Sequence, residues 1–263
     1  MSKNIKVFIG WDSREAAATE VAAYSIRKRT KYPVHITYLK HRELRKAGQF
    51  TRPWLVDSTT GNYTDLIDNK PFSTEFSHTR FLVPALMEYK GWALFFDADM
   101  IFQSDIAELF SLVNDKYAVM CVKHDHKTKD GAIKMDDRAQ LAYHRKNWSS
   151  FVLFNCGHPA NARLTKEYVS FARGVDLHTF SWLKEEEIGA LPFNYNFISG
   201  VSPKITGKPA VIHYTEGGPW FEGYEHVPYA DLWLNEYEDC QRNREEFIIT
   251  DVPTMACDKE DRC

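Results

Sequence analysis

Two aspartates at the end of an apolar run carry the strongest chemical signal in the sequence. The run 92–96 is entirely apolar, and Asp97 and Asp99 follow it, separated only by Ala98. Ionised carboxylates at the edge of a hydrophobic core are costly unless a cation or hydrogen bonds compensate their charge. A divalent cation would do so, and phosphate oxygens would fill its remaining coordination positions. The alternative is that both aspartates cap the following turn or pair with lysines.

A histidine and a pair of glycines follow a later apolar run. His213 comes directly after residues 210–212, and Gly217 and Gly218 come shortly after it. A histidine at a strand end is well placed to bind a metal ion, although a single histidine is more often structural. Adjacent glycines let backbone N–H groups approach an anion closely. The segment is therefore a candidate for metal or phosphate binding.

Two further predicted strands end in polar side chains. Asp12 follows the apolar run 6–10 closely, and Asn155 follows residues 150–154. In open α/β sheets, ligands bind outside the carboxyl ends of the strands. We therefore expect these side chains, the two aspartates and the histidine to lie on one rim of a sheet.

The elements that must position these residues alternate between strand and helix. Residues 6–10 and 34–39 have the apolar pattern of strands, and residues 14–29 between them repeat apolar side chains at helical spacing. Such a βαβ unit indicates a parallel sheet covered by helices. The same criteria predict strands at 92–96, 118–122, 150–154 and 210–212, and helices at 79–89, 106–113 and 163–173.

Two long segments lack any period. Residues 48–76 contain glycines, prolines and scattered aromatic residues, which predicts a long ordered loop, and residues 123–148 are polar and charged, which predicts an insertion over the sheet edge. We expect one α/β domain over residues 1–250, with a mostly parallel central sheet and helices on both of its faces. The charged residues 251–263 are expected to form a loose tail.

Composition excludes several classes of protein. The chain has 263 residues and a formal net charge of −3, whereas a nucleic-acid-binding protein needs a clustered basic face. No apolar run approaches the roughly 18 residues of a transmembrane helix, and no signal peptide is apparent. The five cysteines form no CxxC pair, which is typical of a reducing compartment. We expect a soluble, cytoplasmic protein.

Three blocks of the sequence resemble a known enzyme family. Residues 79–86, 95–99 and 104–110, in this order, are similar to the core of the family eight glycosyltransferases, the glycogenin-like and galactosyltransferase-like enzymes of the GT-A fold. The opening strand with Asp12, the residues 155–157 and the residues 213–220 fit the order of that family's other motifs. The resemblance spans about residues 5 to 220.

The resemblance implies a metal ion and a nucleotide-sugar donor. Asp97, Asp99 and His213 would bind Mn²⁺, with Mg²⁺ as the alternative ion, and the diphosphate of a UDP-sugar would complete the coordination. Asp12 would face the uracil. The residues expected to build the donor site are Ile9, Gly10, Trp11, Asp12, Arg80, Asp97, Ala98, Asp99, Gly217, Gly218 and Trp220.

The resemblance also implies residues that act on the donor sugar. Arg80 would face the sugar or a phosphate, Asn155 would line the sugar pocket, and Glu186 or a neighbouring carboxylate would steady the cationic sugar. With the metal ligand Asp97, these are the residues expected to be catalytic. Family members retain the anomeric configuration, so retention is expected here.

One position departs from the family pattern. Where the family's C-terminal motif has a lysine that reaches a phosphate, this sequence has Gly218, and the motif is one residue shorter. The missing charge would come from another cation, with Lys204 and Lys208 as candidates, or from the backbone N–H groups of Gly217 and Gly218. The alternative is a weakened enzyme.

The function expected from the sequence is metal-dependent transfer of a hexose from UDP-glucose or UDP-galactose to the hydroxyl group of a glycan, polyol or protein acceptor. Two alternatives remain. The first is a weak or inactive nucleotide-sugar-binding protein, because of the missing lysine. The second is a haloacid-dehalogenase-type phosphatase, in which an Asp-x-Asp motif also follows an apolar strand. Against the second, Asp97 and Asp99 lie in mid-chain and precede Met100 and Ile101.

Overall fold

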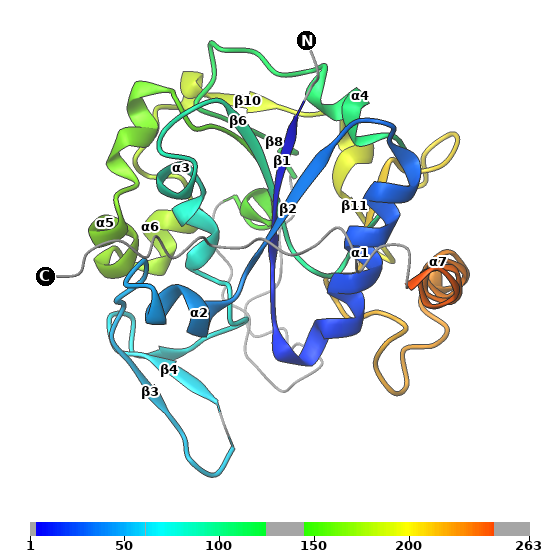
Figure 1. The fold of residues 1–263 in the computed structure, drawn as a ribbon, viewed down its shortest axis with the longest axis horizontal. Helices are drawn as coiled ribbons and strands as arrows, with labels where there is room; N and C mark the ends of the chain where they lie inside the picture. The colour runs from blue at the N-terminus through cyan, green and yellow to red at the C-terminus, as the bar shows by residue number, and fades with distance from the viewer. Residues whose placement is uncertain (1–3, 61, 125–144, 245–263) are drawn as a thin grey trace, which may run out of the picture.

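A six-stranded sheet forms the centre of the molecule. The computed structural model describes residues 4–60, 62–124 and 145–244. The strand order is β10-β8-β9-β6-β1-β2. Helix α1 (Ala16–Arg29) and helix α7 (Ala230–Arg242) lie on one side of this sheet, and α3 (Val83–Leu86), α5 (Lys166–Phe171) and α6 (Gly174–His178) lie on the other (Figure 1). This is the predicted α/β class with a mostly parallel sheet and helices on both faces.

The N-terminal βαβ unit forms as predicted. Strand β1 (Ile5–Gly10) leads through the 3-10 turn η1 (Ser13–Glu15) into α1, and β2 (Val34–Leu39) then pairs with β1 in parallel. Strand β6 (Trp92–Phe96) pairs with β1 on its other side, also in parallel. The carboxyl ends of these three strands therefore meet at one rim of the sheet, where residues 11–15 and 97–99 follow.

Strand β9 (Phe151–Asn155) runs against its neighbours. It is antiparallel to β6 and to β8 (Val119–Cys121), with Trp92 opposite Asn155 and Phe96 opposite Phe151. Asn155 thus lies beside the start of β6, at the rim opposite Asp97. The prediction that Asn155 shares a rim with the aspartates is wrong, because that prediction assumed a parallel strand.

A second, three-stranded sheet brings the histidine to the aspartates. It has the order β11 (Phe197–Ile198), β12 (Val211–His213) and β7 (Met100–Phe102). Strand β7 begins immediately after Asp99 and is antiparallel to β12, with Met100 opposite His213. A small core joins this sheet to α1 and α7; its buried residues are Val21, Ile101, Ile212, Tyr214 and Trp233.

A third sheet corrects the prediction for residues 48–76. Instead of an irregular loop, this segment forms an antiparallel meander of β3 (Trp54–Val56), β4 (Tyr63–Asp65) and β5 (Lys70–Pro71), which projects from the body beside α2 (His41–Lys46) (Figure 1). Its strands have two or three residues each. Strands this short give no detectable alternation, so the sequence pattern missed them.

The remaining elements are short. The predicted helix 79–89 is a 3-10 turn, η2 (Thr79–Leu82), followed by α3, and the predicted helix 106–113 is α4 (Ile106–Phe110). The other elements are η3 (Trp148–Ser150), η4 (Pro159–Arg163), η5 (Glu185–Glu187), β10 (Ile188–Ala190) and η6 (Phe193–Asn196). Most of the predicted insertion 123–148 and all of the predicted tail 251–263 lie outside the described residues.

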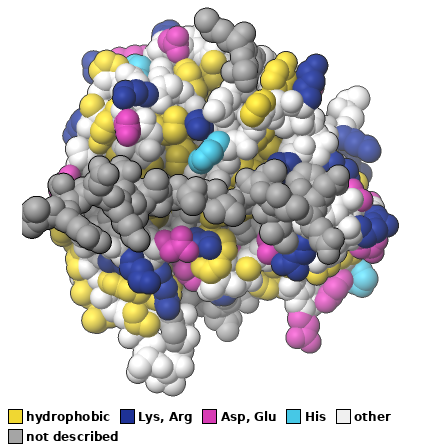
Figure 2. All heavy atoms as spheres, viewed as in Figure 1, with side chains coloured by type: hydrophobic (Ala, Val, Ile, Leu, Met, Phe, Trp, Pro, Cys, Tyr) yellow, Lys and Arg dark blue, Asp and Glu magenta, His cyan; other side chains and the backbone are white. Residues whose placement is uncertain are grey.

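The surface seen in Figure 2 mixes both signs of charge. On this face, Lys and Arg side chains are interspersed with Asp and Glu and with hydrophobic side chains over the described residues. Within the same described ranges, the structure contains no helix long and apolar enough to cross a bilayer.

Candidate metal and donor site

Asp97, Asp99 and His213 meet at the junction of the two larger sheets. Asp97 directly follows β6, Asp99 precedes β7, and His213 ends β12. A ligand atom from each residue lies within 4.8 Å of the others, and His213 Nε2 is 3.4 Å from Asp99 Oδ2. The backbone N–H of Tyr214 also donates to the Asp99 carbonyl at 2.9 Å. The β7–β12 pairing thus holds the two ends of the cluster in fixed register.

The hydrogen bonds of His213 fix the orientation of its imidazole ring. His213 is buried, and its Nδ1 contacts Asn196 Oδ1 at 2.8 Å. Asn196 Nδ2 donates to Ser150 Oγ at 3.0 Å, so the amide oxygen faces the imidazole and accepts its N–H. Nε2 therefore has the lone pair, and this buried atom makes no hydrogen bond to any described residue. A buried imidazole nitrogen beside two carboxylates suits Mn²⁺ or Mg²⁺, and a polar partner on the other ring nitrogen is typical of metal ligands.

Arg80 fixes the carboxylate of Asp97. Its Nη1 donates to Asp97 Oδ1 at 2.7 Å and to the Ser149 carbonyl at 2.9 Å. The guanidinium is buried and lies over the rings of Phe76 and Phe95. Ser149 and Ser150, which the sequence reasoning missed, occupy the place at this rim that it had assigned to Asn155.

Asp12 lies in the site region but is buried and already bonded. Its carboxylate accepts from Arg14 Nε at 2.9 Å, from Arg14 Nη2 at 2.7 Å and from the Glu75 backbone N–H at 3.1 Å. Burial alone would raise the pKa of Asp12, but the hydrogen bonds and charge of Arg14 outweigh burial and lower it. An ionised Asp12 thus fixes Arg14, which sequence reasoning did not single out.

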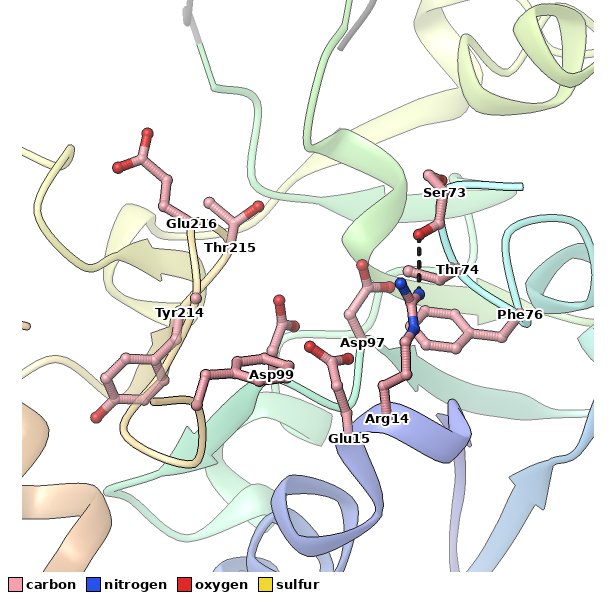
Figure 3. A pocket seen from close by; sticks show the side chains of 12 residues that line it. Arg14, Glu15, Ser73, Thr74, Phe76, Asp97, Asp99, Tyr214, Thr215 and Glu216 are labelled. Carbon is pink, nitrogen blue, oxygen red and sulfur yellow. Dashed lines mark hydrogen bonds between the residues drawn. The ribbon is translucent and has the colours of Figure 1, made fainter. Parts of the chain in front are cut away.

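A pocket opens beside the candidate metal site, which is the cluster of Asp97, Asp99 and His213 (Figure 3). Among its described lining residues, four have carboxylate side chains and Arg14 is the basic one. The lining residues are Arg14, Glu15, Ser73, Thr74, Phe76, Asp97, Asp99, Tyr214, Thr215, Glu216, Gly217 and Phe221. A pocket with this charge attracts cations, and an anionic ligand would need positive charge supplied inside it.

The remaining residues of the opening strand support the pocket from outside it. Ile9 is fully buried in the core, and a Cβ on Gly10 would lie 2.3 Å from the ring of Phe76. Glycine at this position therefore lets the pocket residue Phe76 pack against β1. Trp11 is half-buried, with Lys40 Nζ 5.5 Å from its ring centroid. Ala98, between the two aspartates, is fully buried.

The turn after His213 explains why no lysine stands in it. Gly217 lines the pocket, whereas a Cβ on Gly218 would lie 2.0 Å from the ring of Trp220. Trp220 packs on Tyr214 and Trp233, so its ring cannot readily move. Lys204 and Lys208, the expected substitutes, are exposed and are not among the pocket's described lining residues.

Of the four residues expected to be catalytic, Asp97 is among the described lining residues of the pocket, and Arg80 contacts Asp97 from outside that lining. The other two, Asn155 and Glu186, are not brought to the pocket. Asn155 Nδ2 donates to the Tyr117 carbonyl at 3.2 Å on the opposite rim. Glu186 is exposed in η5 and does not line the pocket, and its neighbour Glu185 pairs with Lys123 and Arg145.

Several known proteins have a similar sequence or a similar structure. Protein CDI of Arabidopsis thaliana is 44% identical over 248 residues, which are 93% of this chain and 90% of CDI. The apo structure of the bifunctional glycosyltransferase WbbM has a TM-score of 0.62 at 17% identity, covering 93% of this chain and 51% of WbbM. The chain thus spans about half the length of WbbM.

Two other solved glycosyltransferases share the fold. GlyE of Streptococcus pneumoniae TIGR4 has a TM-score of 0.55 at 13% identity, over 89% of this chain and 61% of GlyE. The galactosyltransferase LgtC, solved with donor and acceptor sugar analogues, has a TM-score of 0.52 at 11% identity, over 89% of this chain and 96% of LgtC. A family model described as glycosyl transferase family 8 matches residues 7–223. With this match and the GT-A architecture, the chain belongs to glycosyl transferase family 8.

Proposed function

We propose that this glycosyltransferase moves a hexose from UDP-glucose or UDP-galactose to a hydroxyl group of a glycan, polyol or protein, with a divalent cation held by Asp97, Asp99 and His213. The observation that carries this proposal is the buried Nε2 of His213, which Asn196 turns toward the two carboxylates. Family membership leaves the phosphatase alternative without support.

The chemistry of the transfer explains why such a site needs positive charge. The bond between the anomeric carbon and a diphosphate oxygen breaks, and its electron pair leaves with the diphosphate. The acceptor oxygen forms the new bond to that carbon, and its proton passes to the departing diphosphate. When bound, Mn²⁺ or Mg²⁺ would neutralise the growing negative charge on the leaving group.

The chain's own residues prepare this site. Arg80 orients Asp97, Asn196 orients His213, and the β7–β12 pairing sets the distance between His213 and Asp99. We propose retention of the anomeric configuration, with the acceptor attacking from the face that the diphosphate leaves. An inverted product observed by NMR would contradict this part of the proposal.

The direct test is thermal unfolding with UDP, with and without Mn²⁺, in comparison with GDP and ADP. UDP at a hundred times its Kd would add about 2.7 kcal/mol of stability, which is roughly 5 °C for a chain of this size. We expect a UDP-specific shift that requires Mn²⁺. No shift with any nucleotide would contradict the proposal, and a shift without turnover for any acceptor would identify the inactive binding protein.

The variant Asp99→Ala tests the metal ligands. It is expected to abolish the Mn²⁺-dependent shift and the activity while the far-UV circular dichroism stays unchanged, because Asp99 lies at the pocket and not in the core. The control Asp57→Ala removes an exposed carboxylate from the β3–β4 turn and should behave like wild type. Unchanged turnover of Asp99→Ala at saturating Mn²⁺ would exclude the metal assignment.

A further inference from the structure

The pocket beside the candidate metal site is acidic, which disfavours the binding of an anionic ligand. Glu15, Asp97, Asp99 and Glu216 all line it, against one basic side chain among the described lining residues, Arg14. Arg80 pairs with Asp97 from outside this lining, but it is directed at Asp97 and Ser149 and does not face the pocket. A diphosphate in this acidic pocket would be stabilised by direct contact with a cation of the protein that faces it.

Arg14 is held ready for such a contact. Its Nε and Nη2 donate to the two oxygens of Asp12 at 2.9 and 2.7 Å, and Nη2 also donates to the Ser73 carbonyl at 3.2 Å. Asp12 is fully buried, whereas the Arg14 side chain is 39% exposed. The buried carboxylate of Asp12 thus fixes the guanidinium of Arg14, which is accessible from the pocket. Because the side chain is already held in place, it loses little conformational entropy when it binds an anion.

The lysines that the sequence suggested for this charge, and Arg80, do not line the pocket in the described chain. A side chain on Gly218 would collide with Trp220. Arg80 is buried and directed at Asp97 and Ser149. Lys204 and Lys208 lie outside the described pocket lining.

We propose that Arg14 binds the diphosphate of the donor directly and that Asp12 is the residue that positions it, rather than a residue that reads the uracil. This inference rests on the proposed function, because it takes the pocket's ligand to be a nucleoside diphosphate sugar.

Binding of UDP and UMP, measured by calorimetry in the presence of Mn²⁺, tests the role of Arg14. The variant Arg14→Gln keeps a polar group beside Asp12 and removes the charge. We expect its Kd for UDP to rise about 10- to 100-fold, as for the loss of one charged hydrogen-bonding partner, with a much smaller change for UMP. Arg14→Lys should recover part of the affinity, and the control Lys208→Gln should equal wild type.

The affinity for Mn²⁺ alone separates phosphate binding from a structural role. Removing a positive charge beside Asp97 and Asp99 should leave Mn²⁺ binding unchanged or tighten it, whereas a collapsed pocket would weaken it. Weaker binding of both Mn²⁺ and UDP by Arg14→Gln would therefore overturn the inference, as would unchanged UDP binding. If wild type itself does not bind UDP with Mn²⁺, the proposed function fails first, and this inference with it.

The positioning role of Asp12 has its own readout. Asp12→Asn should weaken UDP binding but not UMP binding, and adding Arg14→Gln to it should cost little more, because both changes remove one interaction. Fully additive losses, or a loss of UMP binding in Asp12→Asn alone, would indicate instead that Asp12 contacts the nucleoside and would overturn this part.

Discussion

At the scale of single residues, the chemistry of the site depends on partners that lie far away in the sequence. His213 can act as a ligand because Asn196 accepts the hydrogen bond of its Nδ1, and Asn196 is itself fixed by Ser150. Likewise, burial by itself would raise the pKa of Asp12, but the hydrogen bonds and charge of Arg14 lower it and keep Asp12 ionised. In each case a buried polar side chain orients the residue at the site: Asn196 orients His213, and Asp12 orients Arg14.

Asn196→Ala should weaken metal binding without removing a ligand. The imidazole of His213 would lose the acceptor that sets its orientation and tautomer, and such partners are typically worth about 10- to 100-fold in metal affinity. Titration calorimetry with Mn²⁺ measures this effect. Ser150→Ala, which leaves Asn196 Oδ1 in place, serves as the control with a smaller loss. Equal Mn²⁺ affinity in Asn196→Ala and wild type would contradict the role of Asn196.

At the scale of elements, a buried ion cluster anchors the small β3–β5 sheet to the body. Arg52 is fully buried, pairs with Asp65 through Nε and Nη2 at 2.8 and 2.6 Å, and donates to the Ala172 carbonyl after α5 at 2.6 Å. Asp65, Asp68 and His78 also have the spacing of metal ligands. Because the guanidinium of Arg52 already supplies the positive charge there, the cluster is best explained as structural.

Arg52→Ala should destabilise the protein strongly. It would leave Asp65 buried without its cation, and breaking a buried pair in this way typically costs about 3 to 5 kcal/mol. Urea unfolding measures the loss. The control Arg173→Ala breaks the exposed Arg173–Asp176 pair on α6 and should leave the urea midpoint unchanged. A midpoint for Arg52→Ala close to that of the control would show that the cluster does not anchor the sheet.

At the scale of the whole molecule, buried neutral histidines make stability depend on pH. Burial, with the charges of Arg45, His78 and Arg42, lowers the pKa of His41 to about 3, and Arg45 Nε donates to His41 Nε2 at 2.7 Å. Burial also lowers the pKa of His78 and of His178. The unfolded chain takes up protons at these groups as the pH falls below about 6.5, whereas the native protein does not.

Stability should therefore be complete above about pH 7 and should fall as the pH is lowered toward 5. His41 alone accounts for about 2 kcal/mol of this loss at pH 5, at about 1.4 kcal/mol per pH unit below its unfolded pKa. Urea unfolding at both pH values checks this. His41→Gln, which can still accept from Arg45, should lose less stability on acidification than wild type. The same pH dependence in both proteins would rule His41 out as a source.

The sequence by itself determined the features that depend on neighbouring residues. The first βαβ unit, strand β6 and the aspartates that follow it are local: a run of apolar residues forms a buried strand, and the polar residues at its end must lie at the rim. The same reasoning predicted the turn after β12 and the position of its histidine at the end of that strand. A family pattern in residues 79–110 then added the fold and the class of reaction.

Only the tertiary structure decided how these pieces face one another. Because β9 is antiparallel to β6, Asn155 lies at the far rim and Ser149 and Ser150 lie near Arg80. The apolar pattern of a strand does not indicate whether the strand is parallel or antiparallel to its neighbours. Among the described residues that line the pocket, the basic one is Arg14, which a buried carboxylate fixes and which faces walls contributed by distant segments. Long-range contacts determine the direction of a strand, the pairing of β7 with β12 and the orientation of a side chain. A local sequence pattern contains no information about such contacts.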